Sequence, residues 1–224
     1  MKCEVELLKG TKWPRHSPRQ ALGRIPAMKK LLIASGNAHK VGEIRKILHG
    51  LPLEVLSLKD IHNTVPEPEE NGLTFVANAH IKSRAYAGIF DQWILADDSG
   101  IVVPALNGEP GIYSARYAGI GASDAANRHK LQSKVRELGG QLPAYFVCAL
   151  SLYIPGAEPK IFEAHWNGEV VDYDRGENGF GYDSMFIPLN EDRSSAQMSE
   201  DEKNRVSHRG QALAKFKSFV EKIL

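Results

Sequence analysis

An apolar run that ends in two adjacent carboxylates, WILADDSG at 93–100, limits what this chain can fold into. Four apolar residues in succession predict a buried strand. Charged residues are almost never buried unless they are paired, so the two aspartates that follow need a partner or a use. The sequence therefore predicts a strand over 93–97 whose end delivers Asp97 and Asp98 to a site, followed by a second apolar segment at 101–106.

Strand-like and helix-like segments alternate along the chain from about residue 28. Short apolar runs bounded by turn residues predict strands, and apolar residues spaced by three or four predict helices. Besides 93–97 and the segment 101–106, the expected strands are 30–35, 53–58, 145–154, 161–166 and 169–171. The expected helices are 41–48, 74–88, 123–138, a short one from 199 and a closing one through 223. This alternation predicts an α/β protein with a mixed β-sheet and flanking helices.

Turn and cap residues set the expected boundaries. Thr74 and Ser123 are N-cap residues, and Ser199 begins a capping box. Asn167-Gly168 is typical of a two-residue hairpin turn between 161–166 and 169–171. Gly210 is expected to separate the last two helices.

Composition narrows the class of protein. The chain has 224 residues, 25% of them charged, and a net charge of +1, so no overall field marks a nucleic-acid binder. Its two cysteines indicate a reducing, cytoplasmic location, and no apolar run approaches the roughly 20 residues that span a bilayer. Residues 1–28 hold six basic and two acidic side chains and no secretory pattern. We expect them to be an N-terminal extension, with a single domain at 29–224.

The turn after the first expected strand could hold an anion. Ser35, Gly36, Asn37, Ala38, His39 and Lys40 lie between that strand and a helix N-terminus, where backbone N–H groups and the helix dipole favour phosphate. The segment lacks the spacing of a Walker A motif. A plain strand-to-helix turn is an equally good interpretation of these residues alone.

Carboxylates recur in two places. Glu67, Glu69 and Glu70 form an acidic loop, and Asp97-Asp98 follow a strand. Either group could be solvated charge or a cap. Beside a phosphate-binding turn, however, carboxylate oxygens are suitable ligands for Mg²⁺ that bridges substrate phosphates.

Two further clusters complete the set. The first, Phe180, Gly181, Tyr182 and Asp183, follows Gly179 and has the composition of a loop that stacks on a ring, although a glycine-rich surface turn is equally compatible. The second places Lys203, Ser207, His208 and Arg209 in and after a capped helix, where solvated charge is the common alternative.

Six segments occurring in order together resemble the inosine triphosphate pyrophosphatases, the HAM1-like nucleoside triphosphate pyrophosphatases. They are SGNAHK (35–40), EENGLTFVANA (69–79), ADDSG (96–100), PGIYSARYAG (110–119), GFGYD (179–183) and EKNRVSHRGQAL (202–213). The resemblance implies hydrolysis of ITP, dITP and XTP to the monophosphate and pyrophosphate. It also implies Mg²⁺ dependence, an elongated mixed sheet with two lobes around a central nucleotide-binding cleft, and a homodimer.

The resemblance also assigns roles to individual residues. It implies that Ser35 to Lys40 hold the triphosphate, that Glu70 and Asp98 bind the metal, and that Asp98 accepts a proton. Lys82 is implied as a catalytic lysine on the phosphate side and Ser99 as a substrate contact. The remaining implied nucleotide contacts are Phe180, Gly181, Tyr182, Asp183, Lys203, His208 and Arg209. Ser184 departs from the family, which usually has proline there, and is expected to loosen the turn slightly.

Two alternatives stay open at this point. One is a related enzyme that removes another modified nucleotide, such as a methylated or pyrimidine triphosphate. The other is a nucleotide-binding module without catalysis, against which the set of Glu70, Lys82 and Asp98 argues, because binding alone needs no general base. His208 and Arg209 are suitable donors to a C6 carbonyl oxygen, which would favour hypoxanthine and xanthine over adenine.

Overall fold

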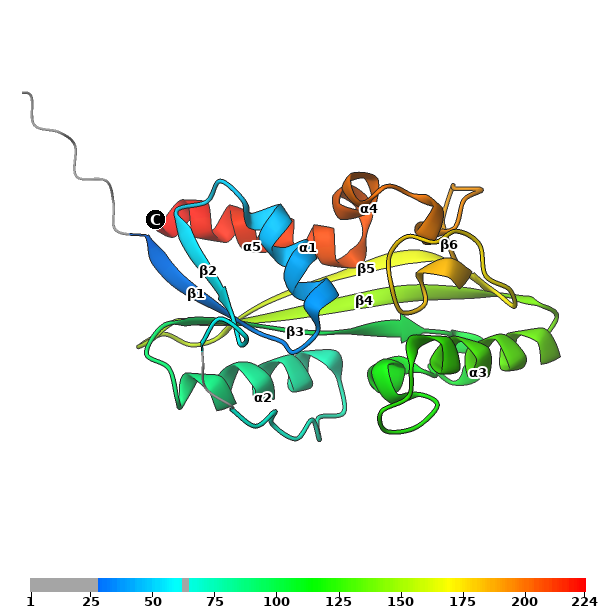
Figure 1. Ribbon diagram of the computed structural model, residues 1–224, viewed down its shortest axis with the longest axis horizontal. Coiled ribbons are helices and arrows are strands. Elements are labelled where there is room, and N and C mark those ends of the chain that lie inside the picture. Colours follow the sequence, from blue (N-terminus) through cyan, green and yellow to red (C-terminus); the bar gives the residue numbers. More distant parts are fainter. Residues whose placement is uncertain (1–27, 62–64) are drawn as a thin grey trace, which may run out of the picture.

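The computed structural model describes residues 28–61 and 65–224. Six strands in these residues form one sheet in the order β2-β1-β3-β4-β5-β6 (Figure 1). β1 pairs in parallel with β2 and β3, whereas β3 to β6 pair antiparallel with one another. The strands are β1 Lys29–Ala34, β2 Leu53–Ser57, β3 Trp93–Val102, β4 Gln141–Tyr153, β5 Lys160–Val171 and β6 Phe186–Pro188. The mixed α/β sheet expected from the sequence is confirmed.

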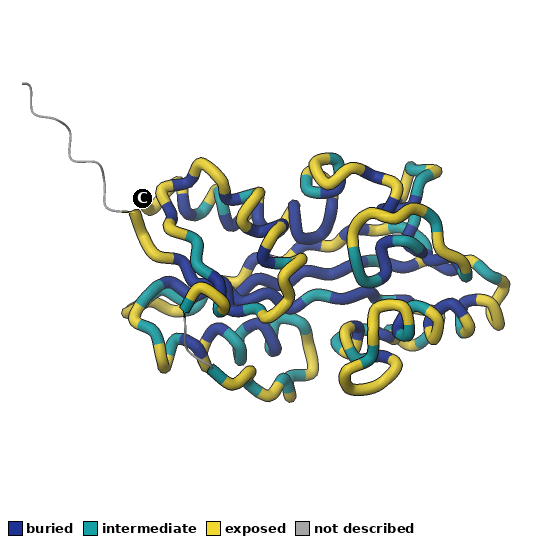
Figure 2. Tube along the Cα trace, in the orientation of Figure 1, coloured by how far each residue is buried: buried dark blue, intermediate teal, exposed yellow. Residues whose placement is uncertain are grey.

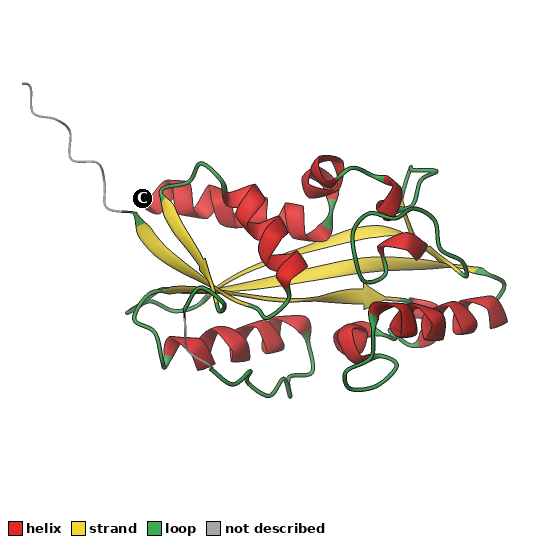
Figure 3. Cartoon of the chain, viewed as in Figure 1, coloured by secondary structure: helices red, strands yellow, loops and turns green. Residues whose placement is uncertain are grey.

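Helices cover both faces of this sheet. α1, α4 and α5 lie on one face, and α2 and α3 lie on the other (Figure 3). Four short 3-10 turns accompany them: η1 Pro104–Leu106, η2 Gly111–Arg116, η3 Asp183–Met185 and η4 Ser195–Gln197. The α-helices are α1 Ala38–Leu48, α2 Phe75–Ala87, α3 Asp124–Glu137, α4 Glu200–Val206 and α5 His208–Ile223. Among residues 28–61 and 65–224, no helix is long and apolar enough to cross a membrane.

Burial follows the strands through the middle of the molecule (Figure 2). In β1, Leu31 and Ile33 join the core beneath α1 and α5, whereas Leu32 and Ala34 join the core above α2. Alternate side chains of a strand point to opposite faces. A strand covered on both faces therefore needs a continuous apolar run, which β1 supplies as LLIA at 31–34.

The cap residues expected from the sequence are confirmed. Thr74 and Ser123 accept hydrogen bonds from the backbone N–H groups of the first turns of α2 and α3, respectively. Ser199 and Glu202 form the expected capping box at the start of α4. These boundaries follow from contacts within four residues, so local sequence was sufficient to predict them.

The strand that holds the paired acids is longer than expected. β3 continues through Asp97 and Asp98 as far as Val102, because β4 pairs with it in register over its whole second half. The two acids therefore lie in the middle of a strand, not at its end. Asp97 shares the α1/α5 face of the sheet with Leu95, and Asp98 shares the α2 face with Ala96. The apolar segment expected at 101–106 is divided between the end of β3 and η1.

The hairpin expected at Asn167-Gly168 is wrong. β5 runs through both residues, and Gly168 pairs with Ala144 of β4 and Pro188 of β6. A Cβ atom on Gly168 would collide with the carbonyl oxygen of Ile187. The glycine therefore permits the close approach of an edge strand, a role that its local sequence does not distinguish from a turn.

The break between the last two helices lies at Ser207 and not at Gly210. Ser207 ends α4 and caps α5, because its Oγ accepts a hydrogen bond from the backbone N–H of Gly210 at 3.2 Å. Gly210 is the third residue of α5, and a Cβ atom there would collide with the carbonyl oxygen of Asn204. Glycine at this position allows the two helices to meet closely.

Candidate functional site

The candidate site opens where β1 ends. The pairing of β1 with β3 stops at Ala34 opposite Ala96, while β3 continues. The chain turns there into α1, which Asn37 caps by accepting hydrogen bonds from the backbone N–H groups of His39 at 3.0 Å and Lys40 at 3.2 Å. Ligands of open α/β sheets bind outside the carboxyl ends of parallel strands, and a helix N-terminus favours an anion.

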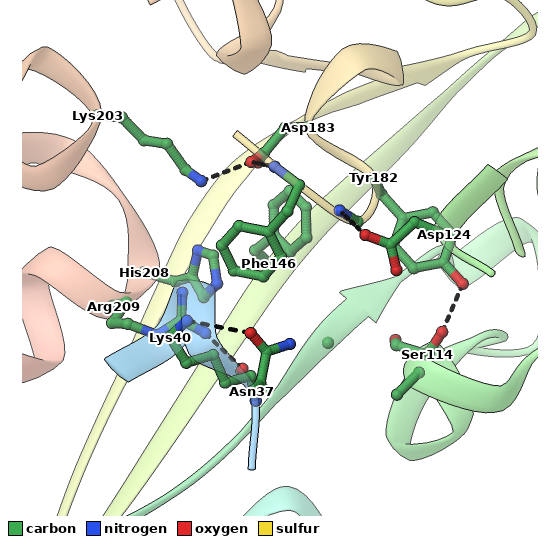
Figure 4. A pocket seen from close by; sticks show the side chains of 15 residues that line it. Asn37, Lys40, Ser114, Asp124, Phe146, Tyr182, Asp183, Lys203, His208 and Arg209 are labelled. Carbon is green, nitrogen blue, oxygen red and sulfur yellow. Dashed lines mark hydrogen bonds and ion pairs between the residues drawn. The ribbon is translucent and has the colours of Figure 1, made fainter. Parts of the chain in front are cut away.

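Two pockets adjoin along the free edge of β3 and share Asn37, Lys40, Ser99 and Ala115. We call the first the aromatic pocket; Figure 4 shows its rings and charged side chains. Its other lining residues are Gly100, Ser114, Asp124, Phe146, Phe180, Gly181, Tyr182, Asp183, Lys203, His208 and Arg209. We call the second the carboxylate pocket. Its other lining residues are Ala34, Ser35, Gly36, Glu67, Pro68, Glu70, Lys82, Tyr86, Asp97, Asp98, Ile112 and Arg116.

On the α2 face, Lys82 joins two carboxylates. Its Nζ lies 3.0 Å from Oδ1 of Asp98 and 3.3 Å from Oε1 of Glu70. Burial alone would lower the pKa of Lys82, but the charges of Asp98 and Glu70 raise it, so the ammonium stays protonated. Burial raises the pKa of Asp98, although Lys82 opposes this shift. A carboxylate with a raised pKa is suited to act as a general base.

On the α1/α5 face, Asp97 lies between two cations. Its Oδ1 is 2.6 Å from Nζ of Lys40, and its Oδ2 accepts a hydrogen bond from Nε of Arg209 at 2.9 Å. Ser99 and Cys148 also donate to this carboxylate, at 2.8 Å and 3.4 Å. Burial would raise the pKa of Asp97, but Arg209 and Lys40 hold it well below its usual value. Asp97 is therefore ionised and fully occupied by its partners.

The charge network continues through Glu43, which the sequence analysis missed. Its carboxylate lies 2.5 Å from Nη1 of Arg209 and 3.1 Å from Nζ of Lys203. Lys203 in turn contacts Oδ2 of Asp183 at 2.5 Å. Glu43 follows Lys40 by three residues, which places both on one face of α1. That spacing was the only signal in the sequence, and it does not reveal the partners.

Stacked rings line the aromatic pocket. The rings of Phe146 and His208 lie 4.6 Å apart at 7°, and those of His39 and Phe180 lie 5.2 Å apart at 15°. Lys203 lies over the Phe180 ring, 4.8 Å from its centre. Burial lowers the pKa of His208 well below its usual value, helped by the nearby charges of Arg209 and Lys203. His208 is therefore neutral, and its Nδ1 has no hydrogen-bond partner among the described residues.

The residues predicted to bind substrate do not all line these two pockets. Ser35 and Gly36 line the carboxylate pocket, but Ala38 and His39 line a separate hollow on the outer side of Phe180. The predicted contacts that line the aromatic pocket are Asn37, Lys40, Ser99, Phe180, Gly181, Tyr182, Asp183, Lys203, His208 and Arg209. Most of the predicted set is thus brought together in these two pockets.

Ser184 is hydrogen-bonded through both its side chain and its backbone, and the expected loosening of its turn relative to proline stays a prediction. Its Oγ donates a hydrogen bond to Oδ1 of Asp174 at 2.5 Å, and its carbonyl oxygen accepts one from the backbone N–H of Arg175 at 2.8 Å. The Oγ contact ties this turn to the preceding loop, and proline, which has no side-chain donor, could not form it.

Several lining residues were not singled out as site residues from the sequence. The segment PGIYSARYAG supplied the signal for Ser114 and Arg116 but assigned them no role. Phe146 is hidden in an apolar strand, and Asp124 reads simply as the first residue of a capped helix. Only the meeting of β4, α3 and the 179–183 loop makes these two part of the pocket.

The described residues contain no cluster of three or more His, Cys, Asp or Glu side chains arranged to hold a metal ion by themselves. Glu70 and Asp98 nevertheless approach the same lysine from two elements, and Oδ2 of Asp98 is buried without a partner among the described residues. Mg²⁺ is usually bound by one or two carboxylates together with substrate phosphates and water. This pair fits that pattern.

Comparisons with known proteins show the family to which the chain belongs. The family model described as the Ham1 family matches residues 31–219. The chain is 44% identical over 197 residues to a dITP/XTP pyrophosphatase of Acinetobacter baumannii, with 86% of this chain and 95% of the relative covered. It is 43% identical to a dITP/XTP pyrophosphatase of Bacillus subtilis, covering 87% and 98% of the two chains. The Ham1 protein structure of Staphylococcus aureus superposes with a TM-score of 0.78 at 40% identity, covering 88% of this chain and 100% of that one. The chain therefore belongs to the Ham1 family.

Proposed function

We propose that this protein hydrolyses deaminated purine nucleoside triphosphates, namely ITP, dITP and XTP, to the monophosphate and pyrophosphate. One observation carries the proposal. A lysine buried between two carboxylates, Lys82 with Glu70 and Asp98, lines a charged pocket that opens directly into a pocket of stacked rings. A purine ring and a triphosphate require these two environments side by side.

The turn from Ser35 to Lys40 supports the placement of the phosphates. Asn37 and Lys40 line both pockets, and α1 begins between them. The base would occupy the aromatic pocket, near Phe180, Tyr182 and Asp183. The triphosphate would then extend past the N-terminus of α1 into the carboxylate pocket, toward Glu70 and Asp98.

Asp98 is suited to activate the attacking water. In the proposed reaction its carboxylate accepts a proton as the water oxygen bonds to the α-phosphorus. The bond from the α-phosphorus to the oxygen that bridges to the β-phosphate breaks, and pyrophosphate leaves with that oxygen and its electron pair. Lys82 balances the carboxylates and supplies positive charge next to the phosphates. Because Lys82 donates a hydrogen bond to Oδ1 of Asp98 at 3.0 Å, it also orients the carboxylate that would act as the general base.

Glu70 and Asp98 are the residues that would hold Mg²⁺. When bound, the ion would neutralise phosphate charge and polarise the phosphoryl oxygens. Oδ2 of Asp98 supports this assignment, because it is buried without a partner among residues 28–61 and 65–224 and is therefore able to serve as a ligand.

His208 and Arg209 are suited to distinguish the base. Both line the aromatic pocket, and both can donate a hydrogen bond to a C6 carbonyl oxygen. Arg209 already donates to Asp97, Glu43 and Ser99, so each of its terminal nitrogens has one N–H left to donate. Adenine has an amino group at C6 and would place a donor against a donor. Such a mismatch can lower kcat/KM for the adenine nucleotide by orders of magnitude.

A substrate panel tests this proposal. ITP, dITP, XTP, ATP and GTP are each incubated with the protein and Mg²⁺, and pyrophosphate and orthophosphate are measured separately. We expect pyrophosphate from the first three and little product from ATP or GTP. Orthophosphate as the direct product would contradict a pyrophosphatase. A methylated purine triphosphate and dUTP are assayed in the same way, and turnover confined to either of these two would favour the related house-cleaning enzyme.

We also propose a homodimer in the cytoplasm. The family resemblance supports the dimer, and the free, buried thiol of Cys148 is compatible with a reducing compartment. Light scattering coupled to gel filtration would measure the mass directly, and a monomeric mass at working concentration would contradict the dimer.

A further inference from the structure

Helix α3 holds the peptide groups of Gly181 from two sides. The backbone N–H of Gly181 donates to Oδ2 of Asp124 at 2.7 Å, and its carbonyl oxygen accepts from Nη1 of Arg128 at 2.9 Å. Asp124 and Arg128 are four residues apart and therefore lie on one face of the helix. Gly181 has a φ of 60°, which is open to glycine at little cost. One helical turn thus fixes a backbone conformation in the middle of the loop 179–183.

A second set of contacts fixes Arg128 itself. Its Nε forms an ion pair with Oδ1 of Asp174 at 3.2 Å, without the alignment of a hydrogen bond, and the same oxygen accepts the hydrogen bond of Ser184. The side chain of Arg128 is 22% exposed, so these contacts are partly shielded from water. Arg128 therefore links α3, the loop that contains Asp174, and the turn that contains Ser184. We call Asp124, Arg128, Asp174 and Ser184 the loop clamp.

Arg128 is placed to act through the loop and not on the substrate. Asp124 and Gly181 line the aromatic pocket, whereas Arg128 lies behind the loop and lines a separate hollow with Asp124, Gly181 and Ser184. A bound base in the aromatic pocket would contact the inner side of the loop only. Any effect of Arg128 on the base must therefore pass through the position of Gly181.

The clamped loop carries groups on which the aromatic pocket depends. Phe180 precedes Gly181 and stacks on His39, and its backbone N–H donates to Oδ2 of Asp183 at 2.9 Å. Tyr182 follows Gly181 and donates from its hydroxyl to the carbonyl oxygen of Ser114 at 2.8 Å. A displaced Gly181 would move both rings, and with them the walls against which a purine would rest.

We propose that Arg128, with the rest of the loop clamp, is a positioning residue that sets base affinity and base selectivity. The proposal rests on the proposed function, since it concerns the pocket that would hold the purine. The atoms proposed for chemistry, on Asp98, Lys82 and Glu70, belong to the carboxylate pocket, so the clamp should affect binding more than the hydrolytic step.

The test compares two arginines of the same helix. Arg128→Ala removes the clamp, whereas Arg136→Ala removes an ion pair between α3 and Asp172, at 2.9 Å, without touching Gly181. KM and kcat are measured for ITP, ATP and GTP, and melting temperature confirms folding. We expect Arg128→Ala to raise KM for ITP about tenfold with kcat within about twofold, and to narrow the preference for ITP over ATP. Arg136→Ala should match the unchanged protein.

Two more variants keep the test decisive. Arg128→Lys retains a donor to Gly181 and should recover part of the affinity. Asp174→Asn removes the ion pair that holds Arg128 on the side away from Gly181, and it should also raise KM for ITP, by a smaller factor than Arg128→Ala. This variant keeps the test available if Arg128→Ala fails to fold. An unchanged KM in Arg128→Ala or Asp174→Asn, a fall in kcat alone, or an equal effect of Arg136→Ala would overturn the proposal. If the unchanged protein releases no pyrophosphate from ITP, the proposed function itself fails.

Discussion

Asp97 and Asp98 are neighbours in the sequence and opposites in the structure. Asp97 points to the α1/α5 face, where Lys40 and Arg209 hold its pKa well below the usual value. Asp98 points to the α2 face, where burial raises its pKa and one of its oxygens has no partner among the described residues. Two identical side chains thus differ in charge environment because the strand that carries them alternates its faces.

The difference separates two tasks. The Asp97 side is a closed network of Glu43, Lys40, Lys203 and Arg209, connected to the rings of the aromatic pocket. The Asp98 side consists of Lys82 between the carboxylates of Glu70 and Asp98, next to the turn of residues 35–40. We infer that the first side positions the base and the second performs hydrolysis, and the following changes test that division.

Asp98→Asn should have the largest effect. The amide has almost the same shape but cannot accept the proton of the attacking water and is a poorer metal ligand. Loss of a general base lowers the rate by about 10²–10⁴-fold, and loss of the metal would lower it further. We expect kcat for ITP to fall by at least this factor, with circular dichroism unchanged. Kinetics like those of the unchanged protein would move the base to another carboxylate.

Asp97→Asn should affect folding more than chemistry. It leaves Lys40 and Arg209 facing a neutral group in a buried network, and breaking a buried ion pair on one side costs about 3–5 kcal/mol. We expect urea denaturation to show a loss of this order in the free energy of unfolding. A loss of kcat at full stability would mean that Asp97, and not Asp98, belongs to the reacting group.

The effect of pH on stability should differ between the two acids: ionised Asp97 stabilises the fold, whereas ionised Asp98 destabilises it. In metal-free protein, the stabilisation by Asp97 is present above about pH 4, the unfolded-chain value, and is lost as pH falls through its lowered folded pKa. Asp98 has a raised folded pKa, so its ionised form opposes folding at neutral pH and this opposition disappears as pH falls. Melting temperatures are measured in buffer that contains a metal chelator. The loss of melting temperature in Asp97→Asn, relative to the unchanged protein, should shrink below about pH 4. The gain in melting temperature of Asp98→Asn should be largest at neutral pH and should shrink as pH falls through the raised folded pKa of Asp98. Parallel curves for the two variants would contradict the comparison.

His208→Phe should have the smallest effect and is specific to the base. Phenylalanine preserves stacking on Phe146, now 4.6 Å from the histidine ring, but removes the ring nitrogens. We expect kcat/KM for ITP to fall about tenfold, the value of roughly one hydrogen bond, with ATP changed much less. Equal losses for ITP and ATP would show that His208 does not read the base.

Much of the fold was predictable because its signals are local. The buried runs of β1 and β4, the caps at Thr74, Ser123 and Ser199, and the amphipathic last helix each depend on residues within a few positions. The expected strand ends at Asp97-Asp98 and Asn167-Gly168 were wrong because the length of these strands depends on distant partners and not on local sequence. Pairing with β4 and β6 carries both strands onward, and those partners lie far away in the sequence.

The sequence by itself determined the chemistry available to this protein: which carboxylates, lysines and rings occur, and that they occur in an order typical of one family. Tertiary structure alone decided what each of them does. It sent Asp97 and Asp98 to opposite faces, paired Glu43 with two cations, and turned Ser184 into part of a clamp. The physical reason is that charge state and hydrogen bonding depend on burial and on partners brought close in space, and neither is encoded within a few residues of the chain.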